Sequence, residues 1–321
     1  MGETKAEDRK YRVSKSVLAL LAILMLMVIA AAVYVVPRYG KVFSAFNEQR
    51  KLYSAAKTDL SKAEKENAEL KKQVEDYEAV KSETDAARDE VYAMAAQLEK
   101  DIIDGKSDKK ICYITIDDGP YNRGKDFIEL FNKYDIKATF FLTTANGDKL
   151  PDQANLTARS MYPEYLKYGH TIGNHTYSHD YSKGGVYKNA KTFIDAVEKQ
   201  QEFTKAATGG FTPKIVRFPG GTSMAADQLA PIQEALRKAG YGWIDWTIDS
   251  GDSFGGDDAK ADKILKKVVK ASKDPDQKIM VALFHEWSKE SYKAMPQIIE
   301  KLSAEGYIFL PLFYDSAMVK K

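Results

Sequence analysis

Hydrophobic and polar positions divide the chain into three segments with different patterns. Residues 17–36 form an unbroken apolar run, residues 41–104 show heptad-like spacing without Gly or Pro, and residues 108–321 alternate short apolar runs with amphipathic stretches. These patterns predict, in order, a membrane-spanning helix, a long helical stalk and an α/β domain. Residues 1–16 form a basic tail in front of the apolar run.

The apolar run contains no charged side chain. Its 20 residues would form a helix ~30 Å long, which matches the hydrocarbon core of a bilayer. A cleaved signal peptide is the alternative, but its apolar region is usually about 7–15 residues, so a retained anchor is favoured. Basic residues both precede and follow the run, and the slight bias places residues 1–16 in the cytoplasm. We therefore expect a single-pass protein of the cell membrane whose folded domain is extracellular.

The predicted stalk has an imperfect heptad seam. Polar residues interrupt the seam at Gln49, Asn67 and Thr84, and its phase slips after Tyr77. One interpretation is a solvated single helix or a short antiparallel hairpin. The other is a weak parallel dimer, which would make the protein a homodimer through its stalk. The sequence leaves both open.

The third segment alternates predicted strands and helices, as parallel α/β folds do. The predicted strands are Ile111–Ile116, Ala138–Thr144, Ile215–Phe218, Tyr241–Ile248, Ile279–Phe284 and Tyr307–Leu312. The predicted helices are Lys125–Lys133, Ser160–Tyr168, Ala190–Ala206, Ala226–Ala239, Ala259–Ser272 and Tyr292–Ala304. In an α/β barrel or layered sheet, the chemistry gathers where strands end and loops begin.

Composition narrows the class of protein. The chain is 44% hydrophobic and 29% charged, which is typical of folded protein. Its length of 321 residues suggests about two structural units. Lys and Arg total 48 against 46 Asp and Glu, and this net charge of +2 gives no indication of nucleic-acid binding. The single cysteine, Cys112, excludes an intrachain disulfide and a cysteine-based zinc site.

Acidic and imidazole side chains cluster at the predicted strand ends. Asp117 and Asp118 open an Asp-Asp-Gly-Pro sequence that often is only a turn, but two adjacent carboxylates also suit a site that separates a metal ligand from a base. His175 and His179 have the spacing of one helical turn, so both imidazoles can face one ion, although such pairs also occur by chance. Thr176 stands where zinc proteases of the H-E-x-x-H type have Glu, which excludes that class.

Three other strand ends carry polar candidates. His285 ends a predicted strand, whereas His170 is best interpreted as structural or supporting. Arg217 is either a surface cation before a turn or a guanidinium that holds a carboxylate. Asp249 is a better candidate than Asp252 to orient a histidine, because Asp252 could merely cap a turn.

Together these strand-end motifs resemble those of the polysaccharide deacetylases of carbohydrate esterase family 4, the NodB homology domain. The matching motifs, in chain order, are Thr115–Gly119, His175–His179, Arg217–Gly221, Asp249–Asp252 and Leu283–His285. The resemblance covers about 200 residues and neither the anchor nor the stalk. It implies a distorted (β/α) barrel, in agreement with the alternation of elements.

The resemblance also implies a metal-dependent mechanism. The metal ligands would be Asp118, His175 and His179, with zinc favoured over cobalt, nickel or manganese. Asp117 would be the general base, paired with Arg217, and the backbone N–H of Gly220 would help to hold the oxyanion. His285, oriented by Asp249, would protonate the leaving amine.

The substrate is inferred from context, and three departures from the family pattern bear on the substrate preference. Gly220 and Ser253 stand where the family has aromatic residues, and Glu286 where Asp is usual, so the sugar cleft is altered more than the chemistry. An anchor and a long stalk suit the glycan strands of peptidoglycan, and N-acetylglucosamine is the favoured sugar. An O-acetyl esterase acting on a polymer such as xylan and a non-catalytic glycan-binding scaffold are the alternatives.

Overall fold

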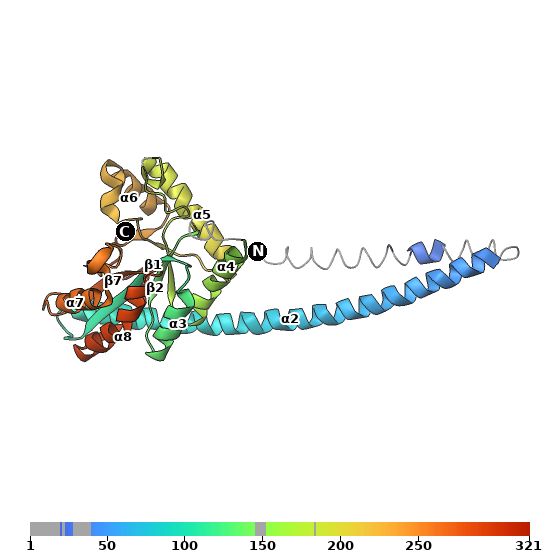
Figure 1. The fold of residues 1–321 in the computed structure, drawn as a ribbon, viewed down its shortest axis with the longest axis horizontal. Helices are drawn as coiled ribbons and strands as arrows, with labels where there is room; N and C mark the ends of the chain where they lie inside the picture. The colour runs from blue at the N-terminus through green and yellow to red at the C-terminus, as the bar shows by residue number, and fades with distance from the viewer. Residues whose placement is uncertain (1–19, 21–22, 28–39, 145–151, 183) are drawn as a thin grey trace. The chain divides into compact units, whose positions relative to one another are not determined.

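A computed structural model describes residues 20, 23–27, 40–144, 152–182 and 184–321 (Figure 1). The chain divides into two compact units after Ala79, and each is described by itself. The basic tail and most of the predicted anchor lie outside the described residues. Within the described ranges, no helix combines the length and the apolar character needed to cross a bilayer.

One helix occupies the region predicted as a stalk. Helix α2 (Gly40–Ile103) runs without interruption for 64 residues, because the segment is rich in Ala, Glu, Lys and Leu and has neither Gly nor Pro in its interior. The antiparallel hairpin is therefore wrong. Pairing of α2 with a second copy stays a prediction.

The second unit is built on a parallel sheet. Its strands are β1 (Lys110–Gly119), β2 (Thr139–Leu142), β3 (Thr171–Asn174), β4 (Ile215–Val216), β5 (Gly242–Trp243), β6 (Ile248–Asp249), β7 (Ile279–His285) and β8 (Tyr307–Phe309). The strand order is β5-β4-β3-β2-β1-β7-β6, and β8 pairs with the first residues of β1. In the described part of the chain, no pairing joins β5 to β6. The predicted α/β class is confirmed, and the sheet is a curled half-barrel that does not close.

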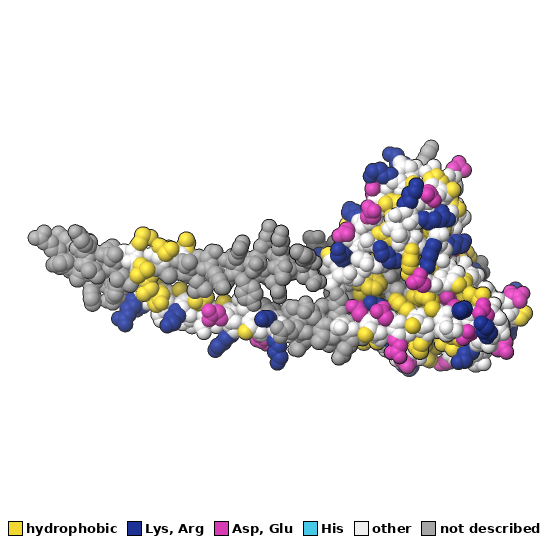
Figure 2. All heavy atoms as spheres, turned by 180° about the vertical axis from the view of Figure 1, so that it is seen from behind, with side chains coloured by type: hydrophobic (Ala, Val, Ile, Leu, Met, Phe, Trp, Pro, Cys, Tyr) yellow, Lys and Arg dark blue, Asp and Glu magenta, His cyan; other side chains and the backbone are white. Residues whose placement is uncertain are grey.

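Besides the end of α2, the described part of this unit has six α-helices (Figure 1). They are α3 (Gly124–Lys133), α4 (Asp152–Lys167), α5 (Ala190–Thr208), α6 (Leu229–Lys238), α7 (Ala261–Ala271) and α8 (Lys289–Ala304). Short 3₁₀ turns are η2 (Val186–Lys188), η3 (Thr222–Gln228) and η4 (Gly256–Ala259). On the face seen in Figure 2, basic and acidic side chains are interspersed over this unit, in keeping with the net charge of +2.

The observed strands differ from the sequence prediction in two places. The predicted strand Tyr241–Ile248 is two strands at opposite ends of the sheet, β5 beside β4 and β6 beside β7, because the chain crosses the open side of the half-barrel between them. Strand β3 was not predicted, since Ile172 is its only large apolar residue. Its Gly173 lies against the ring of Phe141, where an added Cβ would come within 2.3 Å of a ring carbon.

Alternation along β1 separates two hydrophobic cores. Cys112, Ile114 and Ile116 face a core formed with α3, α4, α7 and α8. Ile111 and Tyr113 face the inside of the half-barrel. Further along the same inner face, Thr115 and Asp117 lead to the carboxyl end of the sheet, where the predicted site residues gather.

The end of α2 fills the inside of the half-barrel. Ala95 and Ile102 are buried there beside Tyr113. The buried carboxylate of Glu99 accepts hydrogen bonds from the hydroxyls of Tyr113 and Ser316, both at 2.6 Å. The compact unit accordingly begins at Val80 and includes the last turns of the helix that we assigned to the stalk.

Candidate active site

Strand β1 ends in a bulge that brings two neighbouring carboxylates to one centre. In a regular strand, consecutive side chains point to opposite faces. Here the register with β2 shifts between Asp117 and Gly119, and Asp118 has a φ of 69°. As a result, Asp117 Oδ2 and Asp118 Oδ1 lie 3.7 and 3.5 Å from the same atom, Nε2 of His175.

The two histidines reach this centre from the loop that follows β3. We expected their spacing to reflect one helical turn, but the segment is not helical, since Thr176 and His179 have φ values of 62° and 47°. The turn is held by the His179 backbone N–H, which donates to the Thr176 hydroxyl at 3.3 Å. The turned loop places Nε2 of His175 and Nε2 of His179 3.2 Å apart.

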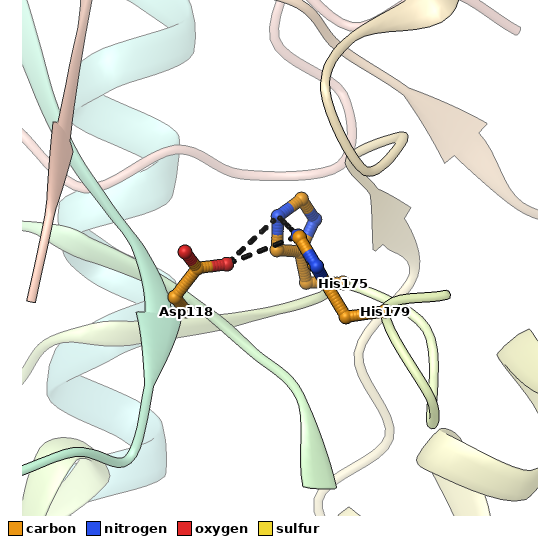
Figure 3. A group of neighbouring side chains, drawn as sticks. All are labelled: Asp118, His175 and His179. Atoms are coloured by element: carbon orange, nitrogen blue, oxygen red, sulfur yellow. Dashed lines mark hydrogen bonds and ion pairs between the residues drawn. The ribbon is translucent and has the colours of Figure 1, made fainter. Parts of the chain in front are cut away.

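Asp118, His175 and His179 form a group of ligand atoms suited to one metal ion (Figure 3). Asp118 Oδ1 lies 3.1 Å from His179 Nε2 and 3.5 Å from His175 Nε2. Ligands bound tetrahedrally at about 2.0–2.1 Å from an ion are ~3.3 Å from one another. The three separations therefore fit a divalent metal held by one carboxylate and two imidazoles.

Protonation of the ligands also suits a metal. Nδ1 of His175 lies 2.8 Å from the backbone carbonyl of Arg217, which can only accept, so Nδ1 carries the hydrogen and Nε2 is free to bind. Burial lowers the pKa of His175 to about 4. Burial alone would raise the pKa of Asp118, but the hydrogen bond from His179 and the neighbouring imidazoles hold it well below its usual range. A neutral imidazole and an ionised carboxylate are the forms that bind metals.

Arg217 is fully buried and holds Asp117. Its Nη1 donates to Asp117 Oδ1 at 2.9 Å and to the Thr115 hydroxyl at 2.6 Å, while Nη2 donates to the backbone carbonyl of Asp245 at 3.1 Å. The guanidinium also lies 4.1 Å from the centre of the Phe141 ring. The surface-cation interpretation is wrong. The buried carboxylate of Asp117 is paired through Oδ1, and its Oδ2 faces the metal-binding group.

Asp252, not Asp249, contacts His285. Asp252 Oδ1 lies 2.7 Å from Nδ1 of His285, whereas Asp249 accepts a hydrogen bond from the Gly251 backbone and lies 4.0 Å from the ammonium of Lys267. The reason is the turn after β6, where Gly251 with a φ of 81° directs the next residue, Asp252, toward His285. Burial lowers the pKa of His285, but Asp252 outweighs that effect and raises it to about 9.

Comparison with known proteins gives this arrangement a family. Residues 104–243 match the profile described as polysaccharide deacetylase. A peptidoglycan-N-acetylglucosamine deacetylase of Bacillus cereus is 31% identical over 209 residues, which are 63% of this chain and 69% of the relative. The chain belongs to the polysaccharide deacetylase family. The resemblance found in the motifs is thereby confirmed, and the reaction class is hydrolysis of amide or ester bonds on a carbohydrate.

Solved structures of polysaccharide deacetylases share the fold. The catalytic domain of a peptidoglycan N-acetylglucosamine deacetylase from Eubacterium rectale is 31% identical with a TM-score of 0.57, and covers 65% of this chain and 91% of its own. A polysaccharide deacetylase from Bacillus cereus is 28% identical with a TM-score of 0.55, covering 65% and 94%. The curled half-barrel is the sheet typical of this family.

The structure describes two of the residues that depart from the motifs of the polysaccharide deacetylase family, Glu286 and Gly220. Glu286 is buried, and its carboxylate accepts hydrogen bonds from the Tyr121 backbone N–H and, at 2.7 Å, from the Tyr165 hydroxyl. It thereby fixes the loop that leaves β1. Gly220 lies in an exposed turn with a φ of 72°, and its part in holding an oxyanion stays a prediction.

The structure gives Asp245 and Trp287 contacts at the candidate site that the sequence analysis did not assign to them. Asp245 accepts hydrogen bonds from the backbone and the hydroxyl of Thr222, and so fixes the turn that follows Gly220. Trp287 donates from its indole nitrogen to Asp118 at 2.9 Å. No motif marks Asp245, and the exposed side chain of Trp287 could be found only by locating what it contacts.

Proposed function

We propose that this polysaccharide deacetylase removes N-acetyl groups from N-acetylglucosamine in peptidoglycan, with the help of a divalent metal, most simply zinc. The observation that carries the proposal is the group Asp118, His175 and His179, with the buried carboxylate of Asp117 turned toward it. Metal ligands and a base at one centre are the requirements of hydrolysis at an acetamide carbonyl.

A divalent cation at this group supplies Lewis acidity, which polarises the carbonyl oxygen and makes water more acidic. Asp117 accepts the proton of the attacking water through Oδ2, while Oδ1 is held by Arg217. The pairing with a fully buried guanidinium keeps the carboxylate oriented toward the metal-binding group.

His285 acts as the general acid for the departing amine. The pKa of about 9 keeps its imidazole protonated at neutral pH, and Asp252 fixes the ring with Nε2 available to the leaving group. The backbone N–H of Gly220 donates to the oxygen on which negative charge develops. Acetate and a free amino group on the sugar are the products.

Peptidoglycan is supported as substrate by two observations of different kinds. Relatives and solved neighbours described as peptidoglycan N-acetylglucosamine deacetylases cover most of the α/β unit. The apolar run at 17–36 and the long α2 suit an enzyme anchored in the cell membrane that works on a polymer outside it. A parallel dimer through α2 belongs to the same proposal.

Acetate release by the purified full-length protein tests the function. N-Acetylglucosamine oligomers, purified peptidoglycan and acetylated xylan would be offered with Zn²⁺ or Co²⁺, beside Asp117→Asn and His175→Ala. We expect metal-dependent release from the first two substrates, a loss of about 10³-fold in Asp117→Asn with metal still bound, and loss of both metal and activity in His175→Ala.

Two results would contradict the proposal. Release from xylan alone would make the protein an O-acetyl esterase. A protein that binds metal but releases acetate from none of the three polymers would be the glycan-binding scaffold.

A further inference from the structure

The indole of Trp287 is bonded to the carboxylate of a metal ligand. Its Nε1–H donates to Oδ2 of Asp118 at 2.9 Å, and the other oxygen, Oδ1, is the one that faces His175 and His179. We infer that Trp287 is a positioning residue, which holds the Asp118 carboxylate with Oδ1 turned toward the metal. The inference rests on the metal site of the proposed function.

The backbone around Trp287 leaves it little freedom. Glu286, before it, donates its backbone N–H to the carbonyl of Asp117 at 2.9 Å. Ser288, after it, closes a turn onto the carbonyl of His285 at 3.1 Å and caps α8 by accepting from the Ser291 backbone. Because both neighbours are fixed, the indole is presented to Asp118 from a rigid junction between β7 and α8.

The position of Asp118 gives the hydrogen bond from Trp287 an effect. Asp118 stands in the bulge of β1 with a φ of 69°, and its side chain is 15% exposed, so a hydrogen bond to Oδ2 adds to the contacts of Oδ1 in opposing rotation of the carboxylate. Partners that orient metal ligands commonly contribute 10–100-fold to metal affinity. His175 has a partner of this kind in the carbonyl of Arg217, and Trp287 is the corresponding partner of Asp118.

Trp287 also contacts His285. The rings of Trp287 and His285 lie 5.1 Å apart at 30°, so the indole contacts both the proposed metal ligand Asp118 and the proposed general acid. Trp287 is nevertheless 36% exposed, so its replacement by another aromatic residue disturbs no core. An exposed tryptophan could also stack on a sugar ring, but that role involves neither its N–H nor the metal.

Metal affinity of the full-length protein distinguishes these roles. Zn²⁺ would be titrated into chelator-treated wild type, Trp287→Phe, which keeps a ring but has no donor, and Tyr168→Phe, an exposed aromatic at the opposite end of the sheet. We expect Trp287→Phe to bind Zn²⁺ about 10–100-fold more weakly and Tyr168→Phe to match wild type. The thermal midpoint of metal-free Trp287→Phe should equal that of the wild type.

Equal Zn²⁺ affinity in Trp287→Phe and wild type would overturn the inference, whereas failure of the wild type itself to bind Zn²⁺ would overturn the proposed metal site. If the variant does not fold, a measurement on the wild type alone tests the hydrogen bond between Trp287 and Asp118. In ¹⁵N-labelled protein, the indole N–H of Trp287 should exchange slowly with water and shift when Zn²⁺ is added. Exchange at the rate of a free indole would contradict the hydrogen bond to Asp118.

Discussion

Both carboxylate oxygens of Asp252 engage His285: Oδ1 lies 2.7 Å from the ring Nδ1, and Oδ2 accepts the backbone N–H at 2.8 Å. Oδ2 also accepts the Ser291 hydroxyl at 2.6 Å, so the start of α8 fixes the same carboxylate. His285 is thereby held by its own strand, by the turn after β6 and, through Ser291, by α8. Both its orientation and its charge depend on Asp252.

Replacement of Asp252 should remove that charge. In Asp252→Ala, burial would lose its main opponent, and the pKa of His285 would fall from about 9, although the charges of Asp118 and Asp117 would still raise it. Since the acid must be protonated, the alkaline limb of kcat/KM should move to lower pH, with a loss of about 10²–10⁴-fold at pH 8. A pH profile of kcat/KM checks this. Asp249→Asn is the control and should stay within about threefold of wild type.

Glu286 should tolerate an amide but not truncation. Its Oε1 accepts the Tyr121 backbone N–H, its Oε2 accepts the Tyr165 hydroxyl, and the Gly124 backbone N–H also donates to the carboxylate. In Glu286→Gln, the amide oxygen can take the backbone donors while the amide nitrogen donates to the tyrosine, so the thermal midpoint should change little. Glu286→Ala leaves buried donors without an acceptor and should lower the free energy of unfolding by about 2–4 kcal/mol. Similar midpoints for the two variants in calorimetry would be evidence against this role.

His170 should make stability depend on pH. The ring is buried at the start of β3, accepts the Ala138 backbone N–H at Nδ1, and burial lowers its pKa to about 3. In the unfolded chain the pKa of His170 is near 6.5, so between pH ~3 and ~6.5 the unfolded state binds more protons than the folded state. The free energy of unfolding that buried His170 contributes is therefore fully present above pH ~6.5 and is lost at up to ~1.4 kcal/mol per pH unit as the pH falls toward 3.

Urea unfolding of the metal-free protein between pH 4.5 and 7.5 measures this dependence. His170→Asn keeps an acceptor near Nδ1 but cannot titrate, so its free energy of unfolding should fall less steeply with decreasing pH. His175 is present in both proteins, and the difference between them reports on His170. Parallel curves would exclude the effect.

The last turns of α2 should be needed for folding of the α/β unit. A fragment of residues 80–321 keeps Ala95, Glu99 and Ile102 inside the half-barrel, whereas residues 108–321 alone lose them and leave the Tyr113 hydroxyl without its carboxylate. Burial of one large aliphatic side chain contributes ~1.5–3 kcal/mol. The shorter fragment should thus be at least about 3 kcal/mol less stable in urea. Coincident unfolding curves would show that α2 is dispensable.

Much of the site could be read from strand ends, and the failures have physical causes. Asp117, Asp118 and His285 each end an apolar run, so the carboxyl edge of a parallel sheet brings them together. The partner of His285 was misassigned because the chain turns at Gly251, and neither periodicity nor spacing reports the direction of a turn. The His175–His179 spacing suggested a helix where a loop with two positive φ values serves the same purpose.

Tertiary contacts account for the remaining differences in the fold. The helical pattern of α2 is the same in its exposed and buried turns, so the sequence could not reveal that Glu99 and Ile102 lie inside the half-barrel. Strand β3 is short and contains a glycine, and it is a strand because β2 and β4 flank it. The roles of Trp287 and Asp245 depend on neighbours more than twenty residues away in the chain.

The bulge in β1 turns the proposed base and a proposed metal ligand, which are consecutive residues, toward one centre. Adjacent Cα atoms are ~3.8 Å apart in any conformation with a trans peptide, so the separation of Asp117 and Asp118 does not depend on how the sheet or its loops move. The histidine loop follows β3 and the junction that carries Trp287 and His285 follows β7, so each reaches this fixed pair from a separate strand. Insertions in the chain beyond those contacting residues are consequently the changes by which the same hydrolytic chemistry can be fitted to other glycans.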